Sequence, residues 1–314
     1  MGTGAEVVVV HAPGVTVQRR ATIWPMALPM QFDTPTALEF FAALVADDSS
    51  FSLLEAAACV AQDEYPQLDT LALLAEVDAL ALRLCQRIPR DAAPLQRMRL
   101  LNQYFFHELG FAGNVNDYYD ARNSYLPDVL ETRRGIPITL AMLYIELATQ
   151  AGLTASGVSF PGHFLVKLRL PPGEAVIDPF TGRSLSKGEL EDRLALFRQQ
   201  PGVLGESDVP LGLFLQPAPA REVIARLLHN LKAIHRAAAD WVRLLAVQER
   251  LLVLLPDDWS ETRDRGLVLA ELGDLAHARL DIAAYLQHCP GAGDAAALLR
   301  RVQHWRQRGG ASVP

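Results

Sequence analysis

The spacing of apolar residues predicts a chain built mainly of helices. Helical periodicity starts at Thr36, while residues 1–35 show no such period. The hydroxyl of Thr36 or of Thr34 suits the helix N-cap. We expect residues 1–35 to form a loose, partly disordered N-terminal arm. Further apolar stripes with helical spacing follow at about 52–63, 68–88 and 94–109. Four helices in succession indicate a helical region that leads into the centre of the chain.

The pattern changes between positions 137 and 178. Residues 137–151 are apolar on nearly every side, which predicts a buried helix, and Gly152 fits a left-handed C-terminal cap. The segment 163–170 then alternates as a strand does, and 174–178 returns after a Pro-Pro-Gly turn. We expect an antiparallel hairpin. The side chains expected to face its core are Phe164, Val166, Leu168 and Leu170, and those expected on a wetter side are His163, Leu165, Lys167 and Arg169.

Helical periodicity returns after a segment rich in proline and glycine. Residues 201–220 form the expected linker, and amphipathic helices follow over 221–314. Pro256 and Pro290 each end a helical pair and lie 34 residues apart, which is the period of the tetratricopeptide repeat. The pattern therefore predicts a short stack of helical repeats. Such a stack either packs on the preceding domain or presents a surface to a protein or peptide partner.

Composition narrows the function classes. Half of the 314 residues are hydrophobic, 21% are charged, and the net charge is −7, which argues against direct nucleic-acid contact. Three sparse cysteines, Cys59, Cys85 and Cys289, form neither a disulfide framework nor a zinc site, so we expect a reduced, cytoplasmic setting. No segment reaches ~18 uninterrupted apolar residues, so we expect no membrane helix.

The sequence suggests no metal or cofactor. The polar segment 116–123 gathers asparagines and aspartates, but it lacks the glycine and the glutamate that a calcium-binding EF-hand loop needs. We interpret this segment as a polar loop with short helical turns.

One histidine and one aspartate occupy positions that suit acid–base chemistry. A thiol at the start of a buried helix ionises easily, because the helix dipole favours negative charge there. A histidine on a facing strand can take its proton, and a carboxylate on the next strand can hold the imidazole. His163 and Asp178 fit the last two roles. The buried helix itself starts at Pro137, and proline carries no nucleophile.

The register of the hairpin decides whether these two side chains meet. A three-residue loop at 171–173 would pair Asp178 with Val166, which leaves His163 out of reach. Contact between His163 and Asp178 needs a register nearer 168 opposite 173. Both registers are compatible with the sequence.

This stretch resembles a known family. The matching text is NSYLPDVLETRRGIPITLA at 123–141, FPGHFLV at 160–166 and IDPF at 177–180. It is similar to the transglutaminase-like superfamily, and in particular to its bacterial SirB-type branch, which couples this domain to tetratricopeptide-like helices. In active members the helix starts Gly-x-Cys, with an alanine four residues after the cysteine and a glycine about fifteen after it. Ala141 and Gly152 stand at those offsets from Pro137.

The resemblance implies an α+β fold that is mainly helical. A papain/transglutaminase-like core with a short antiparallel sheet would occupy 36–200, and a C-terminal α-helical repeat stack would occupy 221–314. It also implies that Pro137 replaces the catalytic cysteine, while His163 and Asp178 match the other two members of the triad.

Two functions remain open at this point. The first is a non-catalytic scaffold that acts as a protein-interaction or regulatory protein. The alternative is a hydrolase or acyltransferase in which His163 and Asp178 activate Thr139 or a water. Thr139 lies two residues beyond Pro137, so about 100° of helix rotation per residue turns its hydroxyl away from the cysteine position. In a weaker third interpretation, only the C-terminal stack binds a partner.

Residues near the entrance of the buried helix are candidates for binding. Tyr125, Arg134 and Asn123 could form the rim of a pocket for an acidic group, with Arg133 beside them. The alternative is that the tyrosine packs in the interior and the arginines are solvated.

Overall fold

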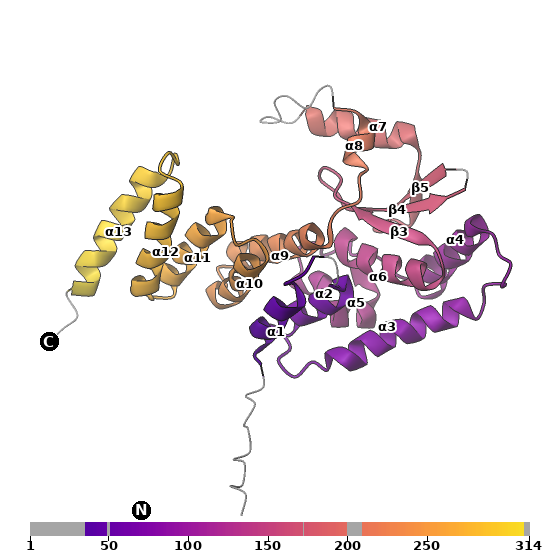
Figure 1. The fold of residues 1–314 in the computed structure, drawn as a ribbon, viewed down its shortest axis with the longest axis horizontal. Coiled ribbons are helices and arrows are strands. Elements are labelled where there is room, and N and C mark those ends of the chain that lie inside the picture. Colours follow the sequence, from indigo (N-terminus) through magenta and orange to yellow (C-terminus); the bar gives the residue numbers. More distant parts are fainter. Residues whose placement is uncertain (1–34, 49–50, 172, 200–208, 311–314) are drawn as a thin grey trace, which may run out of the picture. The chain divides into compact units, whose positions relative to one another are not determined.

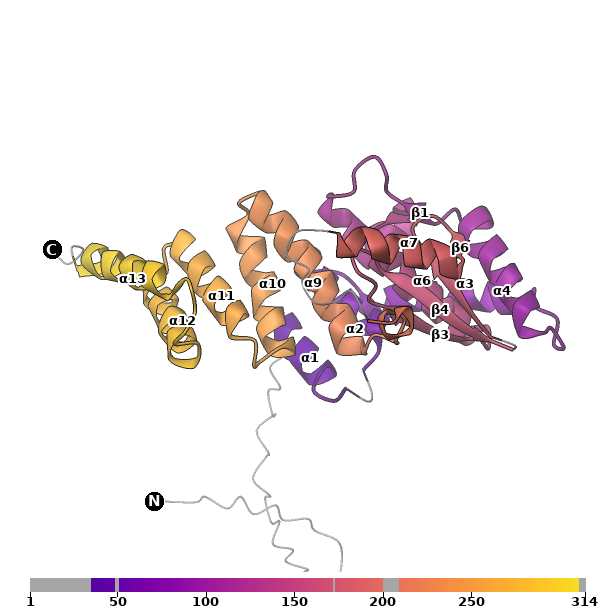
Figure 2. The ribbon, with the colours of Figure 1, turned by 90° about the horizontal axis from the view of Figure 1, so that it is seen from above.

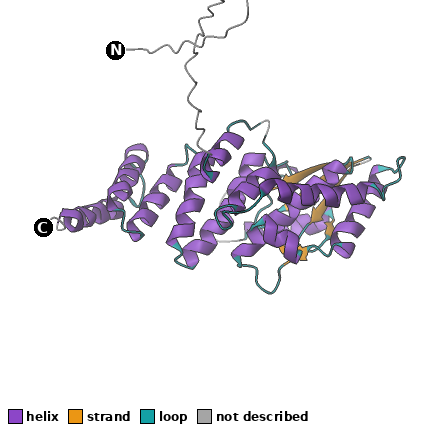
Figure 3. Ribbon diagram, turned by 90° about the horizontal axis from the view of Figure 1, so that it is seen from below, coloured by secondary structure: helices purple, strands orange, loops and turns teal. Residues whose placement is uncertain are grey.

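The computed structural model describes residues 35–48, 51–171, 173–199 and 209–310 (Figure 1). The expected N-terminal arm and part of the expected linker lie outside the described residues. From Thr36 onwards the chain belongs to a single compact unit. The fold is mainly helical with a small antiparallel sheet, as the sequence predicts (Figure 3).

Each of the first three N-terminal helices begins at a side chain that caps it. The Thr36 hydroxyl accepts the backbone N–H of Glu39, and the Glu39 carboxylate accepts the N–H of Thr36 in return, which forms a capping box. Ser52 and Asp69 cap the next two helices in the same position. The helices of this region are α1 (Ala37–Leu44), α2 (Leu53–Ala61), α3 (Thr70–Cys85) and α4 (Pro94–Asn102), followed by the π-helical turn η1 (Gln103–Glu108).

A central helix and a four-stranded sheet form the middle of the chain. The sheet order is β3-β4-β5-β6, all antiparallel, and two further short strands, β1 and β2, pair in parallel. The elements are β1 (Ala112–Gly113), the 3-10 turn η2 (Ala121–Ser124), α5 (Leu126–Thr132), β2 (Arg134–Gly135), α6 (Pro137–Gln150), β3 (Thr154–Val158), β4 (Leu165–Leu170), β5 (Gly173–Asp178) and β6 (Arg183–Leu185).

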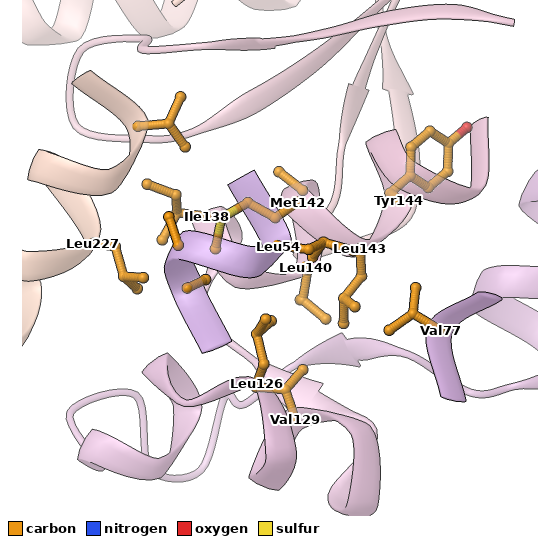
Figure 4. Packing of buried hydrophobic residues seen from close by; sticks show 14 of the residues in the cluster. Leu54, Val77, Leu126, Val129, Ile138, Leu140, Met142, Leu143, Tyr144 and Leu227 are labelled. Carbon is orange, nitrogen blue, oxygen red and sulfur yellow. The ribbon is translucent and has the colours of Figure 1, made fainter. Parts of the chain in front are cut away.

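Helix α6 is the centre of the main hydrophobic core. Every residue from Gly135 to Tyr144 is buried, which confirms the prediction of a helix that is apolar all round. Figure 4 shows side chains from four other helices packed around it. They are Leu54 from α2, Val77 from α3, Leu126 and Val129 from α5, and Leu227 from α9. A fully buried leucine contributes roughly 1.5–3 kcal/mol, so α6 is held firmly where it begins.

The hairpin register differs from both registers considered above. Val166 pairs with Ile177, and Leu170 pairs with Gly173. Strand β4 begins at Leu165, so His163 precedes the strand instead of lying on it.

The predicted inner face of β4 is confirmed, but the prediction for Leu165 is wrong. Phe164, Val166, Leu168 and Leu170 are buried, as expected. Leu165 is also buried, because α7 (Lys187–Arg198) covers the other face of the sheet with a second apolar cluster (Figure 2). That cluster contains Val158, Phe160, Leu165, Val176, Leu185, Leu190 and Leu194.

The C-terminal helices follow one another in a row (Figure 1, Figure 2). After the short helix α8, they form two antiparallel pairs and a last helix, which matches the predicted repeat stack. Ala239 and Gly273, 34 residues apart, both adopt left-handed backbone angles, φ 53° and 89°, between the helices of a pair. The helices are α8 (Leu211–Phe214), α9 (Ala220–Ala237), α10 (Trp241–Leu254), α11 (Trp259–Glu271), α12 (Leu275–His288) and α13 (Ala295–Gly310).

The first helical pair packs against the N-terminal helices. Arg250 on α10 is 1% exposed, makes two hydrogen bonds to the Asp63 carboxylate at 2.5 and 2.7 Å, and lies over the Phe41 ring. Arg221 on α9 donates to the Val45 carbonyl at 2.6 Å. The first repeat is therefore bound to the core, and the expected division at 200 and 221 stays a prediction.

Candidate functional site

The start of α6 is fixed by the loop before it. Pro137 is the first helical residue and is buried. The Thr139 hydroxyl lies 2.8 Å from the Asn123 carbonyl and 3.0 Å from the Ile136 carbonyl, and the Ile136 N–H donates to the same Asn123 carbonyl. A Cβ on Gly135 would lie 2.8 Å from the Thr139 hydroxyl oxygen, so this approach requires glycine.

His163 and Asp178 lie in direct contact. The His163 Nε2 is 2.8 Å from the Asp178 Oδ1, with the imidazole side chain 23% exposed and the carboxylate 2% exposed. His163 reaches this position from the turn at 160–163, in which its own N–H donates to the Phe160 carbonyl and Gly162 adopts φ +68°. The expected contact is present, although neither expected register is. His163 lies in the turn before β4, and side chains in a turn do not follow the alternation between the two faces of a strand.

Asp178 is held as an anion by three donors. Burial opposes its ionisation, but hydrogen bonds from His163, from Arg193 on α7 at 3.2 Å and from the Phe180 N–H at 3.1 Å prevail, so its pKa falls to about 2. An ionised carboxylate accepts from Nε2, which leaves Nδ1 of a neutral imidazole as the hydrogen-bond acceptor. Sequence reasoning missed Arg193, because its role depends on α7 folding back over the sheet.

An aromatic chain runs from this pair to the loop at 114–120. The Phe180 ring lies edge-on to His163, with centroids 6.4 Å apart, and 5.9 Å from the Tyr118 ring. Gly113 donates its N–H to the Phe180 carbonyl, and a Cβ there would come within 2.2 Å of the Phe180 ring. Phe180 is therefore fixed against the strand that precedes the loop.

No thiol of this chain hydrogen-bonds with the imidazole. All three cysteines lie within the described residues. Burial raises the pKa of the Cys59 thiol to about 11, and the Cys85 sulfur donates to the Gln150 carbonyl at 3.3 Å. Cys289 lies in the second helical pair. Thr139 also makes no hydrogen bond with His163 in the described structure, because its hydroxyl is used by the carbonyls of Asn123 and Ile136.

The three candidate binding residues do not form a common pocket rim. Tyr125 is 3% exposed, and its hydroxyl lies 3.3 Å from the His235 Nε2 of α9, so it packs between the core and the stack. Asn123 is buried, and its amide donates to the Asp117 and Tyr118 carbonyls. Arg134 is exposed and donates to the Gly110 carbonyl at 2.7 Å. A shared site for an acidic group at these residues has no support in the geometry.

A cavity lies beside the start of α6 instead. Its volume is about 370 Å³, and it opens between the loop at 114–120 and helix α9. The residues that line it are Tyr118, Tyr119, Ile136, Asn230, Ala233, Ile234, Ala237 and Ala238. Ile136 immediately precedes Pro137, so the cavity adjoins the first residue of α6. In the sequence, the sign of this cavity was the pair of adjacent tyrosines, Tyr118 and Tyr119, in a polar loop.

Comparison with known proteins places the chain in a family. A model described as the transglutaminase-like superfamily matches residues 72–229, and a tetratricopeptide-repeat model matches residues 231–303. A UPF0162 protein of Xylella fastidiosa is 39% identical over 247 residues, which cover 78% of this chain and 86% of that protein. The chain belongs to the UPF0162 family, within the transglutaminase-like superfamily.

Other UPF0162 proteins show the same relationship at lower identity. The one from Vibrio cholerae is 30% identical, with 66% of this chain and 74% of that protein covered. The UPF0162 protein YchA of Escherichia coli K12 is 29% identical, with 73% and 80% covered. No solved structure shows a significant match. The narrower SirB-type assignment is compatible with these relatives and stays a prediction.

The described residues contain neither of two further features. None of their helices combines the length and the apolar content that crossing a bilayer requires. No group of three or more His, Cys, Asp or Glu side chains among them could hold a metal ion.

Proposed function

We propose that this UPF0162 chain is a non-catalytic, SirB-type scaffold that acts in the cytoplasm as a protein-interaction or regulatory protein. One observation carries the proposal. Pro137 occupies the first position of α6, where active relatives in the superfamily place a cysteine, while the His163–Asp178 pair is retained at 2.8 Å.

The missing atom matters because acyl transfer in a triad passes through the nucleophile. Removing the nucleophile of such a triad reduces kcat on the order of 10⁶-fold. The other parts of the machinery cannot compensate, since a histidine and a carboxylate only move protons and orient the imidazole. The remaining pair therefore supports the local fold, and Arg193 ties it to α7.

The repeat half supports a role in protein interaction. Tetratricopeptide stacks generally bind proteins or peptides on faces that their neighbouring helices leave open. In this chain α9 and α10 pack on the core, whereas α11 and α12 pack mainly against each other and against α10. The second pair and α13 thus offer the more accessible faces of the stack.

The runner-up function is hydrolysis or acyl transfer through a water held by His163. One observation favours it: the imidazole is 23% exposed and its partner carboxylate is ionised at neutral pH, so a water at Nδ1 could be polarised. Thr139 is a weaker candidate for the nucleophile than a water, because its hydroxyl already donates to a carbonyl within the core.

Turnover of amide substrates, with and without a primary amine acceptor, separates these functions. We expect the native chain and the His163→Ala variant to give the same background rate. A rate that is clearly above background in the native chain, and that the His163→Ala substitution removes, would make the chain an enzyme and refute the non-catalytic proposal.

A further inference from the structure

A groove at the end of the repeat stack differs in charge from the rest of the stack. It has a volume of about 480 Å³ and lies between α11, the start of α12 and α13. Figure 1 and Figure 2 both show α13 as the last helix of the row. We call this feature the α13 groove, and its lining residues are Ala270, Glu271, Leu275, Ala297, Arg300, Arg301, His304 and Trp305.

Helix α13 concentrates positive charge in an acidic protein. Its residues, 295–310, include four arginines and one histidine and no aspartate or glutamate, although the chain as a whole carries a net charge of −7. Two of those arginines and the histidine line the groove. A polar cap at the end of a stack keeps it soluble, but solubility does not require an excess of positive charge on the wall of a groove.

Most lysines and arginines elsewhere in the stack already have carboxylate partners, although Arg226 on α9 and Arg279 on α12 make no ion pair in the described part of the chain. Lys232 lies 2.5 Å from Glu261 and 2.8 Å from Asp264, and Arg236 lies 2.7 Å from Asp264. Arg265 makes two hydrogen bonds to Asp281, both at 2.7 Å. The pairs of Lys232 and Arg236 join the two repeats, and the Arg265–Asp281 pair joins the two helices of the second repeat, so these cations are not free for a ligand.

The cations of the α13 groove are not matched in this way. Within the described part of the chain, Arg300 and His304 make no ion pair. Arg301 has one partner, Glu271, at 3.4 Å, and both side chains are about half exposed. An exposed pair of this kind contributes little to stability, so a ligand carboxylate can replace Glu271 at small cost.

The groove also has an apolar wall. Trp305 is 6% exposed, and the Arg301 guanidinium lies 5.8 Å from the centre of its ring. Leu275, Ala270 and Ala297 complete that wall. A planar guanidinium that is held over an aromatic ring presents its N–H donors in a fixed direction, which suits a carboxylate.

We propose that the α13 groove binds an acidic peptide segment of a partner protein, with carboxylates on Arg300 and Arg301 and an aliphatic side chain against Trp305. The biological meaning of this site rests on the proposed interaction function, although its chemistry does not. Nucleic acid is a poorer occupant. Phosphate backbones need a wide basic face, whereas this positive charge is confined to one helix and Glu271 lies within the groove.

Fluorescence polarisation with the full-length chain tests this site. The probe is a short fluorescein-labelled peptide of glutamates and leucines, and its matched control carries glutamine in place of every glutamate. We expect the acidic peptide to bind, the control peptide to bind at least about tenfold more weakly, and added salt to weaken the acidic complex. Equal binding of the two peptides, or no binding of the acidic one, overturns the proposal.

Two variants locate the binding. The double substitution Arg300→Glu and Arg301→Glu should weaken the acidic complex by more than about tenfold, since it reverses both contacts. Arg306→Glu changes the charge of the same helix at an exposed residue that does not line the groove, and it should weaken binding less than about threefold. Equal losses of peptide affinity in the two variants would mean that net charge alone explains the binding, and this would overturn the proposed site.

A labelled single-stranded oligonucleotide completes the test. Tighter binding of the oligonucleotide than of the acidic peptide, lost in the same double variant, would assign the groove to nucleic acid and overturn the proposal. Circular dichroism of both variants shows whether the helices remain formed. Failure of peptide binding does not bear on the proposal that the transglutaminase-like domain is non-catalytic, because only amide turnover that depends on His163 contradicts that proposal.

Discussion

The His163 Nε2 lies 2.8 Å from the Asp178 Oδ1, in a chain whose buried helix α6 begins with Pro137. The His163–Asp178 pair is held in place by further hydrogen bonds. Arg193 and the Phe180 N–H also bind the carboxylate, so three separate parts of the chain meet at Asp178. The His163–Asp178 pair thus joins the turn at 160–163, the sheet and α7.

Replacing Asp178 by asparagine should change how stability depends on pH. The pKa of Asp178 is lowered from 3.8 to about 2 in the folded chain, so its contribution is complete above the unfolded pKa and is lost as the pH falls through the folded value. At 1.36 kcal/mol per pKa unit this contribution is about 2 kcal/mol. We expect urea unfolding to show a steeper loss of stability between pH 4 and 2 in the native chain than in Asp178→Asn. Identical pH profiles would mean that the contact does not stabilise the fold.

Gly113→Ala should be destabilising because of Phe180. A Cβ at this position would come within 2.2 Å of the ring, so either the ring or β1 must move, at a cost of about 1–3 kcal/mol. Gly188→Ala is the matched control: it lies in α7 with open space around it, and helix propensity predicts a gain of up to about 1 kcal/mol. Thermal unfolding of both variants checks this, and adding Phe180→Ala to Gly113→Ala should remove part of the loss.

Arg250→Ala should test whether the first repeat is part of the core. Its guanidinium is buried against Phe41 and makes two hydrogen bonds to Asp63, so removing it leaves a carboxylate without its partner and costs about 3–5 kcal/mol. Arg243→Ala removes a half-exposed pair with Glu64 between the same two regions and should cost less than about 1 kcal/mol. Equal effects of the two substitutions in urea unfolding would contradict a tightly docked first repeat.

Thr139→Val should affect stability and leave no trace in catalysis. The substitution keeps the shape but leaves the Asn123 carbonyl with one donor fewer, at a cost of about 1–3 kcal/mol. Thr139→Ser retains the hydroxyl and should recover most of that stability. If amide turnover exists and Thr139→Val abolishes it while Thr139→Ser preserves it, the threonine is a nucleophile and the structural interpretation fails.

The sequence predicted those features that local pattern determines. The Thr36 cap, the buried α6, the left-handed Gly152 at φ +76° and the inner face of β4 all follow from periodicity and from backbone preference. The contact between His163 and Asp178 was expected from the family resemblance, whereas its register was not, because the turn at 160–163 sets the position of His163 independently of strand pairing.

Features that depend on distant segments were not predictable. Leu165 is buried and Asp178 binds Arg193 only because α7 folds over the sheet. Tyr125 was a candidate rim residue, but α9 covers it and supplies His235 as its partner. The α13 groove requires both helices of the second repeat and the last helix, and charge counting along one helix does not reveal which arginines remain unpaired.

Alkylation of a cysteine placed at position 137 tests the central claim most directly. Pro137→Cys is made with Cys85→Ser and Cys289→Ser, while Cys59 remains as a buried thiol whose pKa of about 11 makes it slow to react. If Pro137 stands where the nucleophile belongs, the helix dipole and His163 should lower the pKa of the new thiol below the ordinary value of about 8.5, and His163→Ala should raise it again. A thiol that reacts with iodoacetamide at an ordinary pKa, unaffected by His163→Ala, would contradict the claim.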